Sequence, residues 1–327
     1  MITLPRLKFA NLPTPIHPLP RLAAALGGPR LLAKRDDQTG LAFGGNKTRK
    51  LELLVAEAQA NAARTLVTAG AVQSNHCRQT AAAAARFGLD CILVLSGQEP
   101  SIASGNLLLD RLFGAELVYV QRAERDQRLK ETFQDAWDKG RRPYLVPYGG
   151  SSPTGAAAYA LAVEELMEQC RQSKEEGCPP DWIVFPSSSG GTQAGLVLGS
   201  RLYGYSGNVL GISVDEPGDV LKTRVAALAG ATADLLGERL TFSPDEVLVE
   251  DSYLGGGYGV LGEPEREAIR LFARHEGLLL DPVYTGRAAA GLIDLIRKGF
   301  FSRGDTVLFW HTGGTPALFA DQYRDLV

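Results

Sequence analysis

Short apolar runs recur along the chain, and each leads through a turn containing glycine or serine into a segment with helical character. The runs are continuous rather than alternating, which is typical of parallel strands buried on both faces. Strands that alternate with helices predict an α/β protein with two open, twisted, mostly parallel sheets and helices on both faces. The last run should lead into a terminal helix. The runs and their turns lie at residues 64–70, 91–97, 143–150, 181–195, 209–216 and 305–314.

The turn at residues 186–196, PSSSGGTQAGL, follows one of these strands and precedes a helix. Open parallel sheets bind ligands at the carboxyl ends of their strands. Serine hydroxyls and unhindered glycine amides at a helix N-terminus form a site suited to a phosphate. The turn has neither GxGxxG nor GK[ST], so a dinucleotide or a nucleoside triphosphate is not indicated. The alternative is a flexible turn without a ligand.

A second turn, at residues 71–80, precedes a helix rich in alanine. Ser74, Asn75 and His76 stand at its N-terminus, where their side chains could hold a carboxylate. Ser74 or Asn75 could equally be a plain N-cap, with no part taken by His76. The residues alone leave these two interpretations equal.

A lysine stands at the start of a third helix. Residues 40–54, GLAFGGNKTRKLELL, predict an amphipathic helix with Asn46 as its N-cap. Lys47 then lies at the positive end of the helix dipole, which disfavours a cation. Either Lys47 is simply solvated, or its amine does not stay a cation.

Aromatic residues and threonines complete the set of turns with chemical potential. Tyr258 follows three glycines, Tyr284 and Thr285 precede a helix, and Thr312 follows the last apolar run. Either tyrosine could be a core residue, since most aromatic side chains are largely buried. A lysine that can lose its proton, a phosphate site, a carboxylate site and aromatic rings together indicate pyridoxal 5'-phosphate. Lys47 would then bind the cofactor's aldehyde covalently.

Composition narrows the alternatives. The 327 residues are 45% hydrophobic and 22% charged, with a net charge of -3, which is typical of a globular protein and gives no basic surface for nucleic acid. No apolar run is long enough to span a membrane, and the proline-containing N-terminus has no signal core, so we expect a cytoplasmic protein. The four histidines show no ligand spacing, and we expect no metal. We expect unpaired thiols at Cys77, Cys91, Cys170 and Cys178; the last two flank a polar loop and could pair only in an oxidising setting.

Five blocks of the sequence resemble the tryptophan synthase β-like (fold type II) pyridoxal-phosphate enzymes. Within that group the chain is similar to the branch that contains D-cysteine desulfhydrase and 1-aminocyclopropane-1-carboxylate (ACC) deaminase. The blocks occur in family order from about Lys34 to Leu318, and together they are highly specific. They are KRDDQTGLAFGGNKTRKLE, QSNHCRQTAAAAA, SSSGGTQAG, LLLDPVYTGRAAAGL and HTGGTPAL.

The resemblance implies a role for each matching cofactor residue. Lys47 matches the lysine that holds the cofactor and moves protons at the substrate carbon, and Asn46 matches a residue near the ring hydroxyl. Tyr284 matches the tyrosine that stacks on the ring, and Thr312 the position that faces the pyridine nitrogen. The phosphate loop corresponds to Ser188, Ser189, Gly190, Gly191 and Thr192.

The resemblance also favours substrate binding over plain capping at residues 74–76. Ser74, Asn75 and His76 fall on the loop that binds the substrate carboxylate, and Tyr258 falls on a second active-site tyrosine. The expected catalytic residues are Lys47, Ser74, Tyr258 and Tyr284.

Departures from the ACC deaminase pattern separate the two branches. ACC deaminases are expected to have VYEG and HLGG, whereas this chain has Thr285 in VYTG and Thr312 in HTGG. A neutral threonine gives a weaker electron sink than a carboxylate, and a weaker sink suffices for β-elimination of a good leaving group. SNH at residues 74–76 also resembles the desulfhydrase branch. The sequence therefore favours release of sulfide, pyruvate and ammonia from D-cysteine; ACC deaminase and L-cysteate sulfo-lyase stay open.

Two other functional classes are alternatives to this assignment. A non-enzymatic ligand-binding module could use the same helix ends to hold an anion, and it would lack a covalently bound cofactor. A nicotinamide oxidoreductase would need GxGxxG after an early strand, which the chain lacks. We expect a small domain over residues 48–150, inserted in a large cofactor-binding domain over 1–47 and 151–327. The partners implied by the resemblance are a small amino-acid substrate and a second copy of the chain, in a homodimer.

Overall fold

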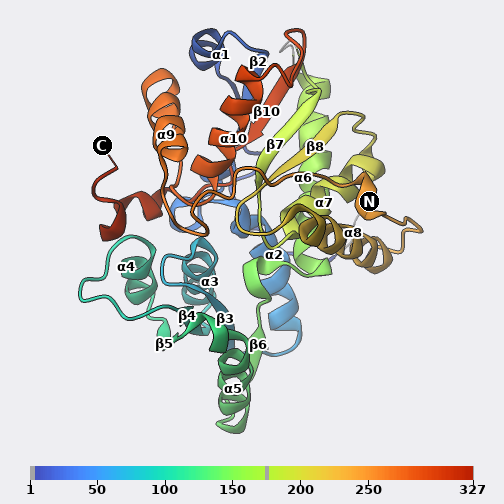
Figure 1. Ribbon diagram of the computed structural model, residues 1–327. Helices are drawn as coiled ribbons and strands as arrows, with labels where there is room; N and C mark the ends of the chain where they lie inside the picture. The colour runs from blue at the N-terminus through green and yellow to red at the C-terminus, as the bar shows by residue number, and fades with distance from the viewer. Residues whose placement is uncertain (1–3, 174–176, 327) are drawn as a thin grey trace.

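The computed structural model describes residues 4–173 and 177–326, and it contains two sheets (Figure 1). The larger has the strand order β1-β2-β10-β7-β8-β9, and the smaller has the order β5-β4-β3-β6. Every neighbouring pair is parallel except β1 and β2. The predicted fold class of two mostly parallel sheets with helices is confirmed.

The strands and helices have the following bounds. The strands are β1 Ile16–Pro18, β2 Arg30–Lys34, β3 Thr65–Ala71, β4 Asp90–Ser96, β5 Glu116–Val120, β6 Pro143–Leu145, β7 Trp182–Ser187, β8 Asn208–Ser213, β9 Leu248–Glu250 and β10 Thr306–Trp310. The helices are α1 Pro20–Leu26, α2 Asn46–Ala60, α3 Asn75–Arg86, α4 Gly105–Leu112, α5 Arg125–Asp138, α6 Pro153–Gln172, α7 Gly191–Tyr203, α8 Gly218–Leu235, α9 Glu263–Glu276 and α10 Thr285–Arg297.

Alternate residues of the larger sheet enter different hydrophobic clusters, as the two-residue period of a strand requires. Val307 and Phe309 of β10 pack in the cluster formed with α1, α9 and α10. Leu308 and Trp310 of the same strand pack with α6 and α7. Because both faces are covered by helices, these strands read as continuous apolar runs in the sequence.

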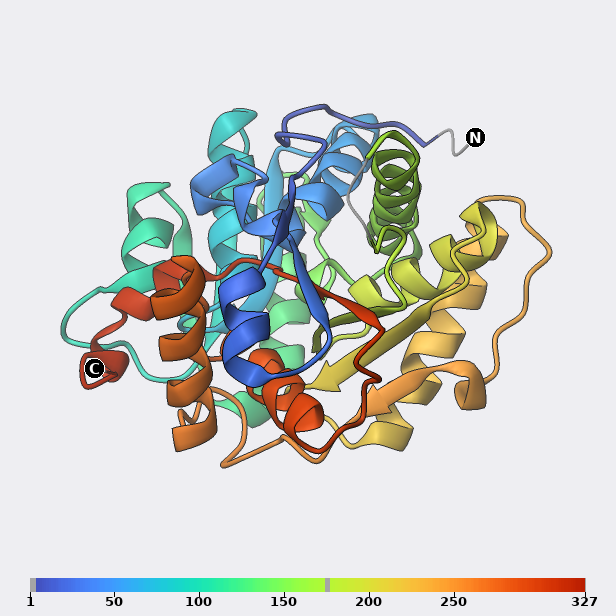
Figure 2. The same cartoon turned by 90° about the horizontal axis from the view of Figure 1, so that it is seen from above.

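The smaller sheet is covered in the same way. Leu66 of β3 packs in a cluster with α2 and α3, whereas its neighbour Val67 packs with Ala136 and Leu129 of α5. In Figures 1 and 2 this sheet, with α3, α4 and α5, lies beside the larger sheet and its helices. Helix α2 packs against both halves, because Leu51 joins the cluster of the smaller sheet and Leu53 packs against Ala157 of α6.

The predicted division into two domains stays a prediction. Of the ranges 1–47, 48–150 and 151–327, residues 1–3, 174–176 and 327 lie outside the described residues. All four strands of the smaller sheet lie within 65–145, and all six of the larger sheet lie outside that range.

Three local predictions were wrong. Helix α2 is not amphipathic, since most of its residues from Thr48 to Ala58 are buried between the two halves of the molecule. Its N-cap is Gly45, and Asn46 is the first helical residue, whose side chain bonds elsewhere. The terminal helix is replaced by two short 3₁₀ turns, Thr315–Phe319 and Asp321–Tyr323.

Two cysteines expected to be unpaired form a disulfide. Cys170, near the end of α6, is bonded to Cys178, and their Cα atoms are 5.0 Å apart. That separation lies within the range a disulfide needs. Cys77 and Cys91 are free and buried, as expected.

A buried ionic cluster fixes the start of α2 against the rest of the core. The guanidinium of Arg49 donates to both carboxylate oxygens of Asp36, at 2.9 and 2.8 Å, and to both oxygens of Glu165, at 2.8 and 2.9 Å. Tyr159 adds a hydrogen bond of 2.6 Å to Asp36. Because Arg49 lies two residues after Lys47, this cluster also positions the lysine.

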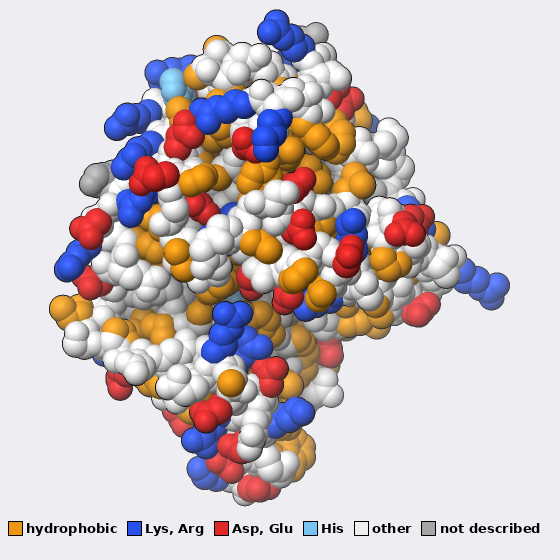
Figure 3. All heavy atoms as spheres, in the orientation of Figure 1, with side chains coloured by type: hydrophobic (Ala, Val, Ile, Leu, Met, Phe, Trp, Pro, Cys, Tyr) orange, Lys and Arg blue, Asp and Glu red, His pale blue; other side chains and the backbone are white. Residues whose placement is uncertain are grey.

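Within the part of the chain that the structure describes, no helix combines the length and the apolar character that crossing a bilayer demands. On the face shown in Figure 3, acidic and basic side chains are interspersed.

Candidate active site

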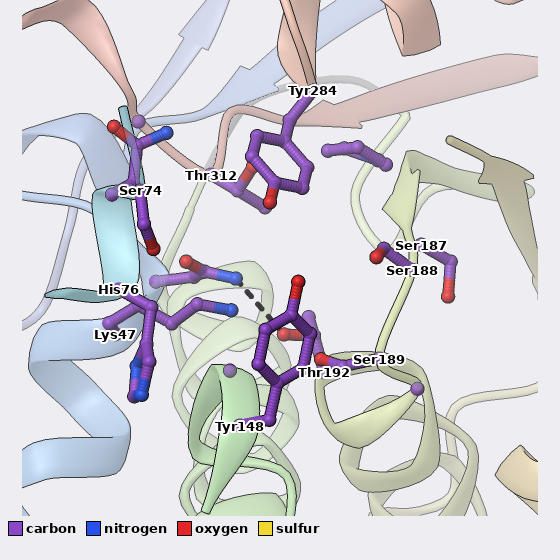
Figure 4. A pocket seen from close by; sticks show the side chains of 16 residues that line it. Lys47, Ser74, His76, Tyr148, Ser187, Ser188, Ser189, Thr192, Tyr284 and Thr312 are labelled. Carbon is purple, nitrogen blue, oxygen red and sulfur yellow. Dashed lines mark hydrogen bonds between the residues drawn. The ribbon is translucent and has the colours of Figure 1, made fainter. Parts of the chain in front are cut away.

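Most of the predicted site residues line one cavity, which lies where α2, α3 and α7 begin (Figure 4). About 630 Å³ of space in and above this cavity, open solvent included, is free of protein atoms. Lys47 and the serine-rich loop enter from opposite sides, and Tyr284 and Tyr148 point inward from two others. The cavity is lined by Asn46, Lys47, Ser74, Asn75, His76, Tyr148, Gly149, Pro186, Ser187, Ser188, Ser189, Gly190, Thr192, Tyr284, Thr312 and Gly313.

The amine of Lys47 is free to react. Within the described residues it makes no hydrogen bond and no ion pair. Its side chain lies on the cavity wall, and loss of hydration lowers the pKa of its amine from 10.5 to about 8. A lysine in this state is partly neutral near physiological pH, so its nitrogen can act as a nucleophile or a base. Lys47 can therefore stand at a helix N-terminus because its desolvated amine is partly neutral. No carboxylate among the cavity-lining residues favours its charged form.

The turn before Lys47 has an unusual backbone. Ala42 and Phe43 have φ values of 47° and 67°, and a Cβ atom on Gly44 would lie 2.0 Å from the Asp37 carbonyl oxygen. Gly44 is therefore required by the protein's own packing. Two side chains of α3 hold the turn: Arg78 donates to the Ala42 carbonyl at 2.5 Å, and Gln79 donates to the Gly44 carbonyl at 2.6 Å.

Asn46 connects α2 with two other loops. Its backbone amide donates to the Thr312 carbonyl at 2.9 Å, and its side chain donates to the Thr192 hydroxyl at 3.1 Å. The starts of α2 and α7 and the end of β10 are thereby fixed to one another.

The serine-rich loop forms a turn between β7 and α7. Gly190 adopts a left-handed conformation, with φ of 86°, and the helix begins at Gly191. The Gly191 amide donates to the Ser151 hydroxyl at 3.1 Å, and Ser151 lies 2.7 Å from the Ser189 hydroxyl. Hydroxyls and helix amides at such a turn suit a phosphate.

The loop at residues 74–76 combines capping with free donors. Ser74 is the N-cap of α3 and accepts from the Cys77 amide at 3.2 Å, so its hydroxyl hydrogen stays available to donate. The Asn75 oxygen accepts from Asn106 at 2.9 Å, which leaves the Asn75 amide nitrogen free of that bond. The capping interpretation of Ser74 is confirmed, and capping still leaves the hydroxyl able to hold a carboxylate.

His76 is neutral and anchored to the sheet. The Thr68 hydroxyl donates to the Val146 carbonyl at 2.8 Å, so the 2.9 Å contact between Thr68 and His76 has the Nε2–H of His76 as donor. Burial, followed by the charges of Lys47 and Lys50, lowers the pKa of His76 well below 6.5. His76 therefore shapes the cavity without contributing a positive charge.

Two tyrosines form a hydrogen-bonded pair at the site. The hydroxyls of Tyr258 and Tyr284 are 2.8 Å apart, and the rings meet edge to face with centroids 5.8 Å apart. Burial raises the pKa of both hydroxyls well above 10, so both stay protonated at neutral pH. Tyr284 lines the cavity, whereas Tyr258 reaches it only through Tyr284.

Thr312 of the HTGG turn and Thr285 of the VYTG turn have different surroundings. Thr312 lines the cavity. Thr285 is buried, and its hydroxyl donates to the Asp281 carboxylate at 2.7 Å and accepts from the Asp281 amide at 2.8 Å. Asp281 also accepts the Val283 and Tyr284 amides and so fixes the start of α10. The hydroxyl of Thr285 thus serves the turn, and Thr312 is the threonine that faces the site.

Some lining residues were missed in the sequence, and two predicted ones do not line the cavity. Gly191 and Tyr258 are not in the lining: Gly191 lies between the lining residues Gly190 and Thr192, and Tyr258 is hydrogen-bonded to the lining residue Tyr284. Tyr148 and Gly149 were missed because they follow the short strand β6 without a hydroxyl-rich motif. Lys50, one helical turn after Lys47, is buried and donates to the Gly149 carbonyl at 3.2 Å. Its spacing of three from Lys47 could have signalled that both face the same loop.

Comparison with known proteins identifies the family. Residues 7–313 match the family described as pyridoxal-phosphate dependent enzymes. The chain belongs to this family. It is 43% identical to the D-cysteine desulfhydrases of Salmonella typhimurium and Salmonella typhi over 322 residues, which are 97% of this chain and 96% of each relative.

Solved structures agree with this assignment. A crystal structure described as an ACC deaminase homologue is 38% identical, has a TM-score of 0.89, and is matched over 99% of this chain and 97% of its own length. A fungal L-serine ammonia-lyase from Rhizomucor miehei shares only the fold, with 17% identity and a TM-score of 0.66 over 95% of this chain and 97% of that one. The chain is therefore a pyridoxal-phosphate dependent enzyme, and the ligand-binding module is set aside.

The chemistry of the residues around the cavity suits this cofactor. An unpaired amine of lowered pKa faces a serine- and glycine-rich helix N-terminus across a space bounded by two tyrosines. The buried Ser187 hydroxyl has no hydrogen-bond partner among the described residues, as expected for a loop built to meet a ligand. Among the described residues, no group of three or more His, Cys, Asp or Glu side chains could hold a metal ion.

The lowered pKa of Lys47 predicts a pH dependence for the cofactor-free protein. Above pH 10.5 the amine is neutral in both the folded and the unfolded chain, and it contributes nothing. As the pH falls towards about 8, only the unfolded chain takes up the proton, so the free energy of unfolding decreases. Lys47→Met should therefore stabilise the cofactor-free protein by about 2 kcal/mol at pH 7, after allowance for water in the cavity.

Urea unfolding of both proteins at pH 7 and pH 10.5 measures this effect. The advantage of the variant should shrink at the higher pH. An advantage that is independent of pH, or a variant less stable than the wild type at pH 7, would show that the amine is not desolvated.

Proposed function

We propose that this enzyme is a D-cysteine desulfhydrase, which converts D-cysteine to pyruvate, ammonia and sulfide. The observation that carries the proposal is a cavity with a reactive lysine, a neutral Thr312 and no acidic lining residue. Without a carboxylate partner the pyridine nitrogen of the cofactor is a weaker acceptor of electrons. Such a site suits the loss of a good leaving group such as a thiolate. The likeness to D-cysteine desulfhydrases along nearly the whole chain supports the same activity.

The chain's residues would hold the cofactor at four points. Lys47 would bind its aldehyde covalently, and Asn46 would hold the ring hydroxyl. Tyr284 would hold the ring by its aromatic face, and Thr312 would meet the pyridine nitrogen. Bound pyridoxal phosphate supplies an electron sink for the bonds at the substrate's α-carbon. The phosphate site comprises Ser188, Ser189, Gly190, Gly191 and Thr192.

The substrate carboxylate would be held by donors that are not used within the protein. The Ser74 hydroxyl hydrogen and the Asn75 side-chain nitrogen are available, because Cys77 donates to the Ser74 oxygen and Asn106 to the Asn75 oxygen. His76, being neutral, orients this loop through Thr68. Hydrogen bonds at the start of α3, with its positive dipole end, replace a charged partner for the carboxylate.

Two groups could move protons. The amine of Lys47, with a pKa of about 8, can accept the α-proton when it is not bound to the cofactor. The hydroxyls of Tyr258 and Tyr284 stay protonated and are hydrogen-bonded to each other, so they can donate a proton on their side of the cavity. Ser74 is a further candidate for a catalytic role.

A substrate panel tests the proposal. D-cysteine, L-cysteine, β-chloro-D-alanine, L-cysteate and ACC are compared by the rate of keto-acid release. D-cysteine should give the highest kcat/KM of the natural amino acids tested, with equal amounts of pyruvate and sulfide. Preferential formation of 2-oxobutanoate from ACC would assign an ACC deaminase, and preference for L-cysteate would assign a sulfo-lyase; either result replaces the proposal.

We further propose a homodimer in the cytoplasm. The homodimer rests on the resemblance to fold type II enzymes. In a reducing cytoplasm Cys170 and Cys178 would be thiols, and their Cα distance of 5.0 Å accommodates both states.

A further inference from the structure

The segment that carries Tyr258 is rich in glycine and has little structure of its own. It connects β9 to α9, and Gly255, Gly257 and Gly259 have positive φ values of 57°, 102° and 74°. Two backbone hydrogen bonds lie within it, from the Gly257 amide to Leu254 at 3.1 Å and from the Val260 amide to Gly257 at 3.3 Å. Because glycine populates many backbone conformations, this segment needs external contacts to hold one.

Arg287 of α10 supplies most of those contacts. Its side chain is 1% exposed. One terminal nitrogen donates to the Val214 carbonyl at 2.8 Å and to the Gly257 carbonyl at 3.0 Å, and the other donates to the Val260 carbonyl at 2.9 Å. The planar guanidinium thus joins the end of β8 to both flanks of Tyr258.

Two further side chains complete the anchoring. Glu265 accepts from the Nε of Arg287 at 2.9 Å, and its second oxygen accepts from the Gly262 amide at 3.0 Å. The Tyr323 hydroxyl donates to the Gly259 carbonyl at 2.8 Å. The carbonyls at 257, 259 and 260 are therefore each bound by a buried or half-buried side chain, so the backbone around Tyr258 is fixed.

The same helix also fixes Tyr284. Tyr284 is the residue before α10, and Arg287 follows it by three positions, almost one helical turn. Helix α10 therefore positions both tyrosines. The hydroxyl distance of 2.8 Å depends on Arg287 holding the loop of Tyr258 in place.

We propose that Arg287 is a positioning residue, which holds the Tyr258 hydroxyl against Tyr284 and thereby sets proton transfer by this pair. The proposal rests on the role given to the tyrosine pair in the proposed function. Arg287 lies outside the cavity lining and acts only through the loop. Its loss should therefore lower kcat without changing how the cofactor is held.

A double-mutant cycle on the holoenzyme tests this. Arg287→Met alone would leave the buried Glu265 unpaired and could prevent folding, so it is combined with Glu265→Gln, whose side-chain oxygen can still accept from Gly262. This pair of changes should lower kcat for D-cysteine about 10–100-fold with the visible cofactor spectrum unchanged, and Tyr258→Phe should lower it about 100-fold. In the Tyr258→Phe background the Arg287/Glu265 changes should have less than about a 2-fold effect.

Matched variants separate the outcomes. Arg287→Lys, which keeps the charge and some of the donors, should fall between the wild type and Arg287→Met/Glu265→Gln. Arg297→Met, on the exposed face of the same helix, should keep the wild-type kcat. Equal losses from the Arg287/Glu265 changes in both backgrounds, or a fully active Tyr258→Phe enzyme, would overturn the role of Arg287. A wild-type enzyme that releases no pyruvate from D-cysteine would overturn the proposed function instead.

Discussion

Replacing Lys47 by alanine should reduce the turnover of D-cysteine by at least about 10⁴-fold and remove the visible absorbance of the bound cofactor. A single acid–base group typically contributes about 10²–10⁴-fold. Lys47 would supply both covalent attachment and proton transfer, so its loss should reach the upper end of that range or exceed it. Stopped assays of pyruvate and an absorbance spectrum of the purified variant measure both effects.

Lys298→Ala is a suitable control for this experiment. Lys298 is exposed and forms an ion pair with Asp294 on the surface. This variant should keep the spectrum and the turnover of the wild type. An active, coloured Lys47→Ala enzyme would show that another lysine does the work, with the buried Lys50 as the nearest candidate.

Replacing Arg49 by methionine should lower the free energy of unfolding by about 3–5 kcal/mol. The change removes the partner of Asp36, which is fully buried, and of Glu165. An uncompensated buried carboxylate is costly, because no water replaces the lost hydrogen bonds. Burial acts to raise the pKa of Asp36, but the charge and hydrogen bonds of Arg49 outweigh it and bring the value to about 2.

The sign of the pH effect follows from that value. A carboxyl whose pKa falls from 3.8 to about 2 on folding stabilises the protein above about pH 4, and this contribution is lost as the pH falls to about 2. Urea unfolding should therefore show the largest difference between the wild type and Arg49→Met near neutral pH, and a smaller one below pH 4. Arg111→Met, which breaks an exposed pair with Glu99, should cost less than about 1 kcal/mol. Equal costs for the two variants would show that the buried cluster is not specially stabilising.

Sequence patterns predicted the sheets well where strands are buried on both faces. The runs at β3, β4, β7, β8 and β10 are apolar and continuous because helices cover both sides of them. The short or more polar strands β1, β2, β5 and β9 gave no such signal. Helix α2 was mistaken for an amphipathic helix because its polar residues Arg49 and Glu52 are buried by ionic and hydrogen-bonded partners far away in sequence.

The site residues were predicted largely from short motifs at strand ends and from the resemblance to a family. Such motifs mark which loops meet a ligand, since parallel strands bring their carboxyl ends to one edge. They do not reveal contacts supplied from a distance. Lys50 reaches the loop of Tyr148 and Gly149 through the Gly149 carbonyl, and Arg287 reaches the loop of Tyr258 through the carbonyls of Gly257 and Val260. Carbonyl groups are the same in every residue, so no sequence pattern signals them.

The cysteine pair shows a different limit. The spacing of eight between Cys170 and Cys178 was compatible with a bridge, but the expected compartment argued for thiols. Both cysteines pack in the hydrophobic cluster that contains Trp310, and this tertiary packing, which spacing does not reveal, places them together.

The attachment point of the cofactor can be read directly from the wild-type enzyme. Borohydride makes the bond between a lysine and the cofactor permanent, and mass spectrometry of the digested protein then identifies the modified residue. We expect mass spectrometry to find one modified peptide, with the cofactor on Lys47. A cofactor found on Lys50 or any other lysine, or no modified peptide from a coloured enzyme, would contradict it.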